Sequence, residues 1–133
     1  MNKFDPYPNE AERNKTEIKK ALIVDDETDI CYLLSNILKQ KNIQTIFANS
    51  LKEAEQMLHA THPYFVFLDN HLPDGLGINQ IKKWKEKFPS VHFIMISAQD
   101  SGEEKKKAKS DGAEFFIGKP FSKEIILKAI GEA

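Results

Sequence analysis

Polar side chains that could take part in chemistry follow directly after short apolar runs of the chain. They are Asp25, Asp26, Glu27, Asp69, Ser97 and Lys119. Carboxylates held close together repel one another, so some of them take up a proton unless a cation neutralises them. A hard divalent cation suits such a cluster, because Mg²⁺ binds one or two carboxylates and leaves places for water and phosphate oxygens. These residue types therefore indicate a magnesium site.

Asp69 is the candidate nucleophile of this set. A carboxylate can attack phosphorus and form an aspartyl phosphate. The dense negative charge of such a group on Asp69 could be paired by Lys119, and the Ser97 hydroxyl could donate a hydrogen bond to it. Together, metal, nucleophile, hydroxyl and lysine supply the positioning and charge neutralisation that phosphoryl transfer needs. The set therefore predicts phosphoryl transfer to Asp69.

Each of these residues also has an ordinary structural role when it is taken alone. An acidic residue after a strand commonly caps the next helix, so Asp26 or Glu27 could simply begin one. A serine after a strand is usually a turn residue, and a lysine before proline is usually solvated. The prediction of a site therefore depends on their joint occurrence at the ends of apolar runs.

The apolar runs have the character of strands that are buried on both faces of a parallel sheet. They occupy residues 21–24, 43–48, 64–68, 91–96 and 114–117. Strands that alternate with helices predict an α/β domain with right-handed crossovers. In such sheets the ligand site forms at the carboxyl ends of the strands, near the topological switch point. The polar residues that follow the runs are therefore expected to meet at one edge of one sheet.

Helical patterns separate the runs. Apolar residues recur at helical spacing in four segments: Ile30, Leu33, Leu34, Ile37 and Leu38; Ala54, Met57 and Leu58; Ile78, Ile81, Trp84 and Phe88; and Ile125, Ile126, Ala129 and Ile130. Ser50 and Glu53 have the spacing of a capping box at the start of the second helix. A further helix over 101–110 has Ala108 as its only apolar residue, so we expect it to be the most weakly packed.

Length, charge and cysteine content exclude several classes of protein. The chain has 133 residues, about one domain, and 19 basic against 20 acidic side chains give a net charge of −1. A bulk nucleic-acid binder would be basic, and one cysteine excludes a disulfide framework or a multi-cysteine metal site. No apolar run approaches the length of a membrane span, and the start of the chain lacks the apolar core of a secretory signal. We expect a cytoplasmic protein without direct nucleic-acid binding or membrane contact.

Residues 1–19 differ in composition from the rest of the chain. They are mostly polar or charged, and Pro6 and Pro8 break any early helix. We expect a polar extension here that is flexible or partly helical, with the folded domain over residues 20–133. The alternative is that this stretch is a docking arm for a partner.

The ordered motifs resemble the receiver domain of two-component response regulators, of which the chemotaxis receivers are members. The motifs are DDE at 25–27, LDNHLPDGLG at 68–77, ISA at 96–98 and GKPF at 118–121, and the resemblance covers residues 20–133. It implies a flavodoxin-like, doubly wound (βα)5 fold with a five-stranded parallel sheet in the order 2-1-3-4-5.

The resemblance also implies a role for each site residue. Asp69 would be the phosphoacceptor. Mg²⁺, with Mn²⁺ as a substitute, would be held by Asp26 directly, by Asp25 largely through water, by Asp69, and by the backbone carbonyl of His71. Ser97 and Lys119 would bind the phosphoryl group, Ser97 and Phe116 would form the switch, and His71 and Gln99 would tune the dephosphorylation rate. The bond between Lys119 and Pro120 is expected to be cis.

Signalling partners follow from the same resemblance. A histidine kinase or a histidine phosphotransfer protein would supply the phosphoryl group. Phosphorylation would then reshape the face made by the helix over 101–110, the strand over 114–117 and the last helix. That face could contact a downstream output protein, an effector domain that this sequence lacks, or a second copy in a homodimer. The domain would catalyse only its own phosphorylation and dephosphorylation, so it would not be an enzyme.

Two other functions are open at this point. A degenerate receiver would keep the fold as a protein-binding module without being phosphorylated, although the intact set of acids, Ser97 and Lys119 argues against it. An aspartate-nucleophile phosphohydrolase of the haloacid dehalogenase type would carry Asp-x-Asp after the first strand, where this chain has Asp25 and Glu27. The sequence is also compatible both with a stand-alone receiver and with one taken from a longer regulator.

Overall fold

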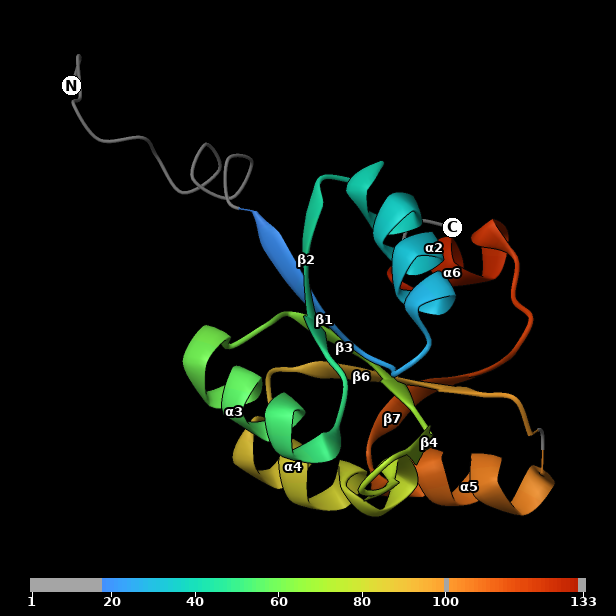
Figure 1. The fold of residues 1–133 in the computed structure, drawn as a ribbon. Helices are drawn as coiled ribbons and strands as arrows, with labels where there is room; N and C mark the ends of the chain where they lie inside the picture. The colour runs from blue at the N-terminus through green and yellow to red at the C-terminus, as the bar shows by residue number, and fades with distance from the viewer. Residues whose placement is uncertain (1–17, 100, 132–133) are drawn as a thin grey trace, which may run out of the picture.

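A five-stranded parallel sheet forms the centre of the protein (Figure 1). The structure, a computed structural model, describes residues 18–99 and 101–131. The strands are β1 (Lys19–Val24), β2 (Ile43–Ala48), β3 (Phe65–Asp69), β6 (His92–Ser97) and β7 (Ala113–Gly118). They lie in the order β2-β1-β3-β6-β7, and every neighbouring pair is parallel. This confirms the flavodoxin-like sheet and its 2-1-3-4-5 strand order.

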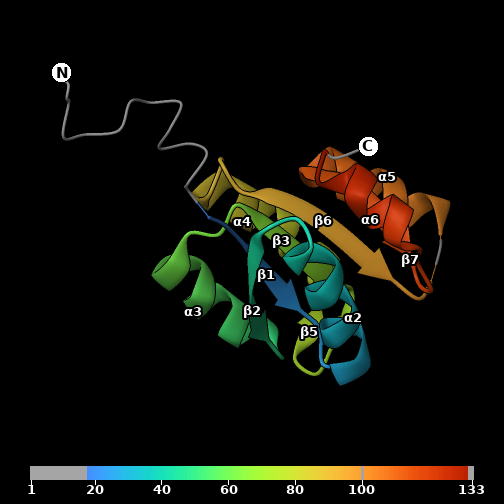
Figure 2. The same ribbon diagram turned by 90° about the horizontal axis from the view of Figure 1, so that it is seen from above.

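Helices cover both faces of the sheet, as the alternation of strands and helices predicted. They are α2 (Thr28–Lys39), α3 (Leu51–Thr61), α4 (Ile81–Lys87), α5 (Gly102–Asp111) and α6 (Lys123–Ala129). Helices α2 and α6 lie on one face, and α3, α4 and α5 lie on the other (Figure 1; Figure 2). After β3, a hairpin of β4 (His71–Leu72) and β5 (Gly75–Leu76) leads into the 3₁₀ helix η1 (Gly77–Asn79).

Each face of the sheet has its own hydrophobic core. Along β1, Leu22 and Val24 belong to the core shared with α3, α4 and α5, whereas Ala21 and Ile23 belong to the core shared with α2 and α6. Successive side chains of a strand point to opposite faces of the sheet, so one continuous apolar run can serve both cores. This explains why the strands read as unbroken apolar runs.

Two residues of the expected apolar helix faces lie outside these cores. Leu33 in α2 is 45% exposed and Ile125 in α6 is 39% exposed, whereas their neighbours Leu34 and Ile126 are fully buried. Neighbouring residues are more than a quarter turn apart around a helix, so the margin of a wide apolar arc can remain in solvent. The expected third helix is also divided, because Ile78 lies in η1 before α4 begins, although its side chain is buried.

The N-terminus of α3 confirms the predicted capping box. The hydroxyl of Ser50 accepts a hydrogen bond from the backbone N–H of Glu53 at 3.1 Å. The carboxylate of Glu53 accepts in return from the backbone N–H of Asn49 at 2.7 Å, one residue before the cap itself. These bonds satisfy N–H groups that have no partner within the helix.

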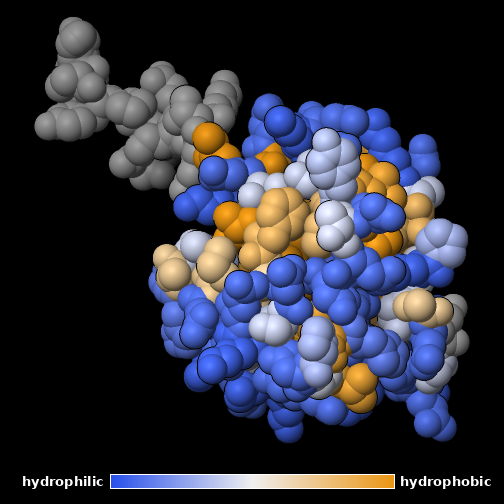
Figure 3. Space-filling view, in the orientation of Figure 1, coloured by the Kyte–Doolittle hydropathy of each residue, from blue (hydrophilic) through white to orange (hydrophobic). Residues whose placement is uncertain are grey.

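Helix α5 has little apolar packing, as expected for residues 101–110. Ala108 is the one buried residue between Gly102 and Asp111, all of which are described. The surface over α3, α4 and α5 is largely hydrophilic (Figure 3). Since packing of an apolar face supplies most of a helix's stability in a protein, α5 depends more than its neighbours on polar contacts.

The expected N-terminal extension falls on residues that the structure mostly leaves undescribed. Residues 1–17 lie outside the described ranges, and the first strand begins at Lys19. Within residues 18–99 and 101–131, no helix combines the length and the apolar character that a membrane crossing requires.

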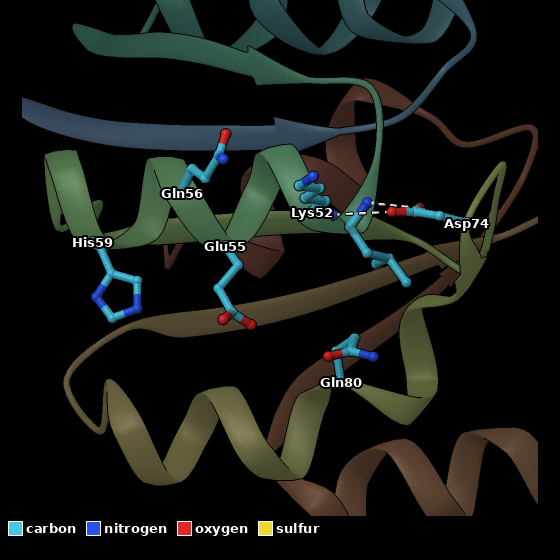
Figure 4. A pocket seen from close by; sticks show the side chains of 7 residues that line it. Lys52, Glu55, Gln56, His59, Asp74 and Gln80 are labelled. Carbon is cyan, nitrogen blue, oxygen red and sulfur yellow. Dashed lines mark hydrogen bonds between the residues drawn. The ribbon is translucent and has the colours of Figure 1, made fainter.

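Asp74, at the tip of the β4–β5 hairpin, ties this hairpin to α3 (Figure 4). Its carboxylate accepts hydrogen bonds from the backbone N–H groups of Leu51 at 2.9 Å and Lys52 at 3.0 Å. These bonds hold the pKa of Asp74 below its usual value, because they stabilise the charged carboxylate. An open groove of about 460 Å³ lies beside this contact and is lined by Leu51, Lys52, Glu55, Gln56, His59, Asp74 and Gln80.

We expect Asp74→Ala to lower the stability of the protein, because two backbone N–H groups of α3 lose their acceptor. The folded pKa of Asp74 lies below its unfolded value near 3.8, so this stabilisation is present above the unfolded pKa and disappears as the pH falls through the folded pKa. Urea unfolding should therefore separate the variant from the parent at neutral pH and bring them together in acid. Asp74→Asn, which keeps one acceptor oxygen, is the matched control. A difference that does not change with pH would contradict the role of the charged carboxylate.

Candidate functional site

The carboxyl ends of four strands bring the predicted chemical groups together at one edge of the sheet. Asp25 follows β1, Asp69 ends β3, Ser97 ends β6 and Lys119 follows β7. Strands β1 and β3 are neighbours, as are β3 and β6 and then β6 and β7, so four separate segments converge there. Asp25 and Asp69 are only 2% and 4% exposed, and Ser97 is fully buried.

Lys119 contacts three carboxylates at once. Its Nζ lies 3.0 Å from Oδ2 of Asp25, 2.7 Å from Oε1 of Glu27 and 3.2 Å from Oδ1 of Asp69. The lysine side chain is almost buried, whereas the Glu27 side chain is mostly exposed. One ammonium group thus faces three acids, and the site has an excess of negative charge.

Burial and this crowding shift the pKa values of the central groups. Burial raises the pKa of Asp25, and hydrogen bonds from the Glu27 backbone and from Lys119 offset only part of this effect. Burial also raises the pKa of Asp69, and the charge of nearby Asp25 raises it further. For Lys119, burial alone would lower the pKa, but its contacts with Glu27, Asp25 and Asp69 outweigh burial and raise it. The lysine is therefore held in its charged form.

Three acidic side chains at this edge could hold a divalent metal ion. Carboxylate oxygens of Asp25, Glu27 and Asp69 all lie within 4.8 Å of one another. Hard carboxylate oxygens are the donors that Mg²⁺ and Ca²⁺ prefer. The donor set therefore fits a divalent cation, as the cluster of acids predicted.

The third carboxylate of this group is Glu27, while the resemblance pointed to Asp26. The Asp26 side chain is exposed, and it does not belong to the group of three. The backbone of Glu27 is extended, and residues two apart in an extended chain point to the same side. Its N–H also donates to Oδ1 of Asp25 at 2.8 Å. The spacing of Asp25 and Glu27 was therefore the available signal.

Ser97 accepts hydrogen bonds from two backbone N–H groups in this structure. Its hydroxyl accepts a hydrogen bond from the backbone N–H of Gln99 at 3.1 Å, and its carbonyl accepts from the backbone N–H of Lys119 at 2.8 Å. Gln99 itself is exposed. The Ser97 hydroxyl thus links the end of β6 to the segment that leads into α5.

The other predicted residues lie around the site. Phe116 in β7 is half-buried against the core shared with α3, α4 and α5. His71 begins β4 and is exposed, two residues after Asp69. The peptide bond between Lys119 and Pro120 is cis, which confirms the expectation. An open groove of about 510 Å³ runs past the end of β7 and is lined by Phe116, Lys119, Pro120, Phe121 and Ile125, among others.

Known proteins are similar to this chain in sequence. A family model described as the response regulator receiver domain matches residues 21–131. The protein PilG of Pseudomonas aeruginosa is 32% identical over 113 residues, which are 84% of this chain and 84% of PilG. The response regulator protein PilR of the same organism is 38% identical over 103 residues, which are 77% of this chain but only 23% of PilR. The chain therefore spans nearly all of one relative and less than a quarter of the other.

Solved structures of receiver domains and response regulators have a similar fold. The beryllofluoride-activated NtrC4 receiver domain dimer matches with a TM-score of 0.81 and 37% identity, over 85% of this chain and 93% of that one. A response regulator from Burkholderia pseudomallei, with a phosphorylated aspartic acid and a calcium ion, matches with a TM-score of 0.78 and 25% identity, over 84% of this chain and 65% of that one. The family match and the position of Asp69 at the end of β3 decide against a phosphohydrolase of the haloacid dehalogenase type. The chain belongs to the response regulator receiver domain family of two-component signalling, a signalling module rather than an enzyme.

Proposed function

We propose that Asp69 is the phosphoacceptor of this receiver domain. The observation that carries the proposal is a buried carboxylate at the end of a central strand, 3.2 Å from a charged lysine and beside a second buried carboxylate. The donor would be a phosphohistidine on a histidine kinase or a histidine phosphotransfer protein. An oxygen of Asp69 attacks phosphorus, the P–N bond breaks, and its electron pair returns to the imidazole nitrogen. Lys119 then pairs with the charge of the new phosphoryl group.

The acidic residues would hold Mg²⁺, with Mn²⁺ as a substitute. We assign Asp25, Asp26, Asp69 and the backbone carbonyl of His71 as ligands of the ion. Glu27 is the alternative to Asp26 as the third carboxylate ligand. The close approach of Asp25, Glu27 and Asp69 supports a cation at this point. The ion, when bound, neutralises charge on the phosphoryl oxygens. Lys119 is then no longer the only group that neutralises the negative charge of the three carboxylates.

Ser97 and Phe116 would carry the signal away from the site. The Ser97 hydroxyl would donate to a phosphoryl oxygen, and Phe116 would take up the space that this movement vacates. The face formed by α5, β7 and α6 would then change shape for an output protein, an attached effector domain or a second copy. A dimer is known for the activated NtrC4 receiver. His71 and Gln99 flank the site from exposed positions, which suits a role in tuning dephosphorylation.

Asp69→Asn should abolish phosphoryl uptake from acetyl phosphate in the presence of Mg²⁺, because an amide oxygen is a much weaker nucleophile than a carboxylate. Intact-protein mass spectrometry would follow the added phosphoryl group. Asp74→Asn changes an acid outside the site and should be phosphorylated like the parent. Equal modification of Asp69→Asn and the parent would show that another residue is the acceptor.

Substitution of the acids should separate their roles in metal binding. Asp25→Asn and Asp26→Asn should each weaken Mg²⁺ binding by about tenfold or more, as expected for loss of a charged ligand. Isothermal titration calorimetry measures this directly. If Glu27→Gln weakens binding while Asp26→Asn does not, the ligand is Glu27 and Asp26 leaves the proposed site.

Asp69→Asn should also stabilise the protein at neutral pH when metal is absent. The folded pKa of Asp69 is raised above its unfolded value near 3.8, so its contribution to stability is full below that value and is lost as the pH rises through the folded pKa. Removing the charge should therefore increase the free energy of unfolding at neutral pH. Urea unfolding in a chelator would measure it. A loss of stability instead would mean that Lys119 more than compensates the buried charge.

A further inference from the structure

Asn70, directly after Asp69, is a polar residue that is 0% exposed. A buried side-chain amide is costly unless its donors and acceptors have partners. It directly follows the central strand β3, in which the four residues before Asp69 are apolar. The position therefore calls for a structural or functional reason.

The backbone and the side-chain oxygen of Asn70 connect three segments. Its N–H donates to the carbonyl of Ile96 in β6 at 3.1 Å, and its carbonyl accepts from the N–H of Gly77 at 2.9 Å. Its Oδ1 accepts from the backbone N–H of Ile78 at 2.9 Å. A backbone N–H requires an acceptor, so this bond decides which end of the amide is the oxygen. The amide nitrogen therefore faces the other way.

That nitrogen faces helix α5. Nδ2 of Asn70 donates to Oε2 of Glu104 at 3.2 Å. Glu104 lies in the first turn of α5, and its own backbone N–H is bound by the hydroxyl of Ser101 at 3.1 Å. The acceptor is thus held by the helix cap, and the bond joins the residue after Asp69 to the start of α5.

This bond reaches a helix with a single buried residue between Gly102 and Asp111. The apolar packing of α5 rests on Ala108. A second polar link, between Ser97 and the N–H of Gln99, holds the segment that enters α5. Both links start from residues that lie at or beside the phosphorylation site, and both end at or just before α5. A change at Asp69 can therefore reach α5 by two hydrogen bonds.

We propose that Asn70 and Glu104 are a positioning pair that couples the state of Asp69 to the orientation of helix α5. The inference rests on the proposed phosphorylation of Asp69. A phosphoryl group there draws the Ser97 hydroxyl away from the N–H of Gln99 and moves the segment that enters α5, so the amide of Asn70 no longer holds Glu104 as in the unmodified protein. The first turn of α5 is then released or repositioned. Neither residue takes part in phosphoryl transfer itself.

Amide hydrogen exchange across residues 102–111 would test the pair in the unmodified protein and with beryllofluoride and Mg²⁺. Glu104→Ala should speed exchange in the unmodified protein by about tenfold, as expected for loss of a charge-assisted hydrogen bond. It should also reduce the change that beryllofluoride causes. Glu104→Gln keeps an acceptor oxygen without the charge and should lie between the parent and Glu104→Ala. Glu103→Ala removes an exposed acid from the same turn and is the matched control.

A reversal of donor and acceptor gives an independent check. Asn70→Asp keeps the oxygen for Ile78 but turns a carboxylate oxygen toward Glu104, so it should loosen α5 as Glu104→Ala does. The double variant Asn70→Asp/Glu104→Gln restores a donor opposite an acceptor and should recover slow exchange. Failure of the double variant to recover, together with normal exchange in Glu104→Ala, would overturn the pair.

Phosphorylation itself separates this inference from the proposed function. Glu104→Ala should take up a phosphoryl group from acetyl phosphate at the parental rate, because Glu104 lies outside the site. If the parent takes up none, the proposed function fails, and exchange in the unmodified protein still shows whether the bond positions α5. If the parent is modified and α5 responds in Glu104→Ala as it does in the parent, the coupling is wrong.

Discussion

Three carboxylates share one ammonium group at the carboxyl edge of the sheet, and the proposed function of the domain depends on this imbalance. Burial raises the pKa of Asp25 and Asp69, so their charges are costly where they stand. Lys119 relieves part of that cost and stays charged because the acids outweigh its own burial. The remaining negative charge makes the site receptive to a divalent cation. A divalent cation would balance the negative charge that Lys119 alone leaves uncompensated.

The fold can hold such a site because the strands that carry it are anchored on both faces. The strands β1 and β3 contribute to two separate hydrophobic cores, so their carboxyl ends cannot easily move apart. Close backbone packing adds to this rigidity. A Cβ atom on Gly77 would lie 2.5 Å from the carbonyl oxygen of Asp69, so only glycine allows this approach. The carboxylate of Asp69 is therefore presented by a stiff support.

The helices α3, α4 and α5, which cover one face of the sheet, differ in how firmly they are packed. Trp84 of α4 is buried, and its indole N–H donates to Glu55 of α3 at 2.9 Å, which joins these two helices. Helix α5 has Ala108 as its buried residue and polar links at its start. Elements that move in switching come from the less stable parts of a structure. A rigid site beside a helix with little apolar packing suits a phosphorylation switch.

Local sequence patterns were enough to locate most of the site. Apolar runs mark the strands, and the polar residues after them, Asp25, Asp69, Ser97 and Lys119, meet because parallel strands end at the same edge. The helical period also predicted which face of each helix is apolar. It did not predict how much of that face packs against the sheet, and Leu33, at its margin, remains exposed.

The spacing of apolar and polar residues along the sequence was enough to predict the alternation of strands and helices. It also predicted which residues lie at the strand ends. The strand order came from the resemblance of its motifs to a family. The contact of Glu27 with Lys119, 92 residues apart, and that of Asn70 with Glu104, 34 residues apart, became visible only in the folded chain. Such contacts depend on how distant segments pack against one another, and no local pattern in the sequence specifies which of their residues meet.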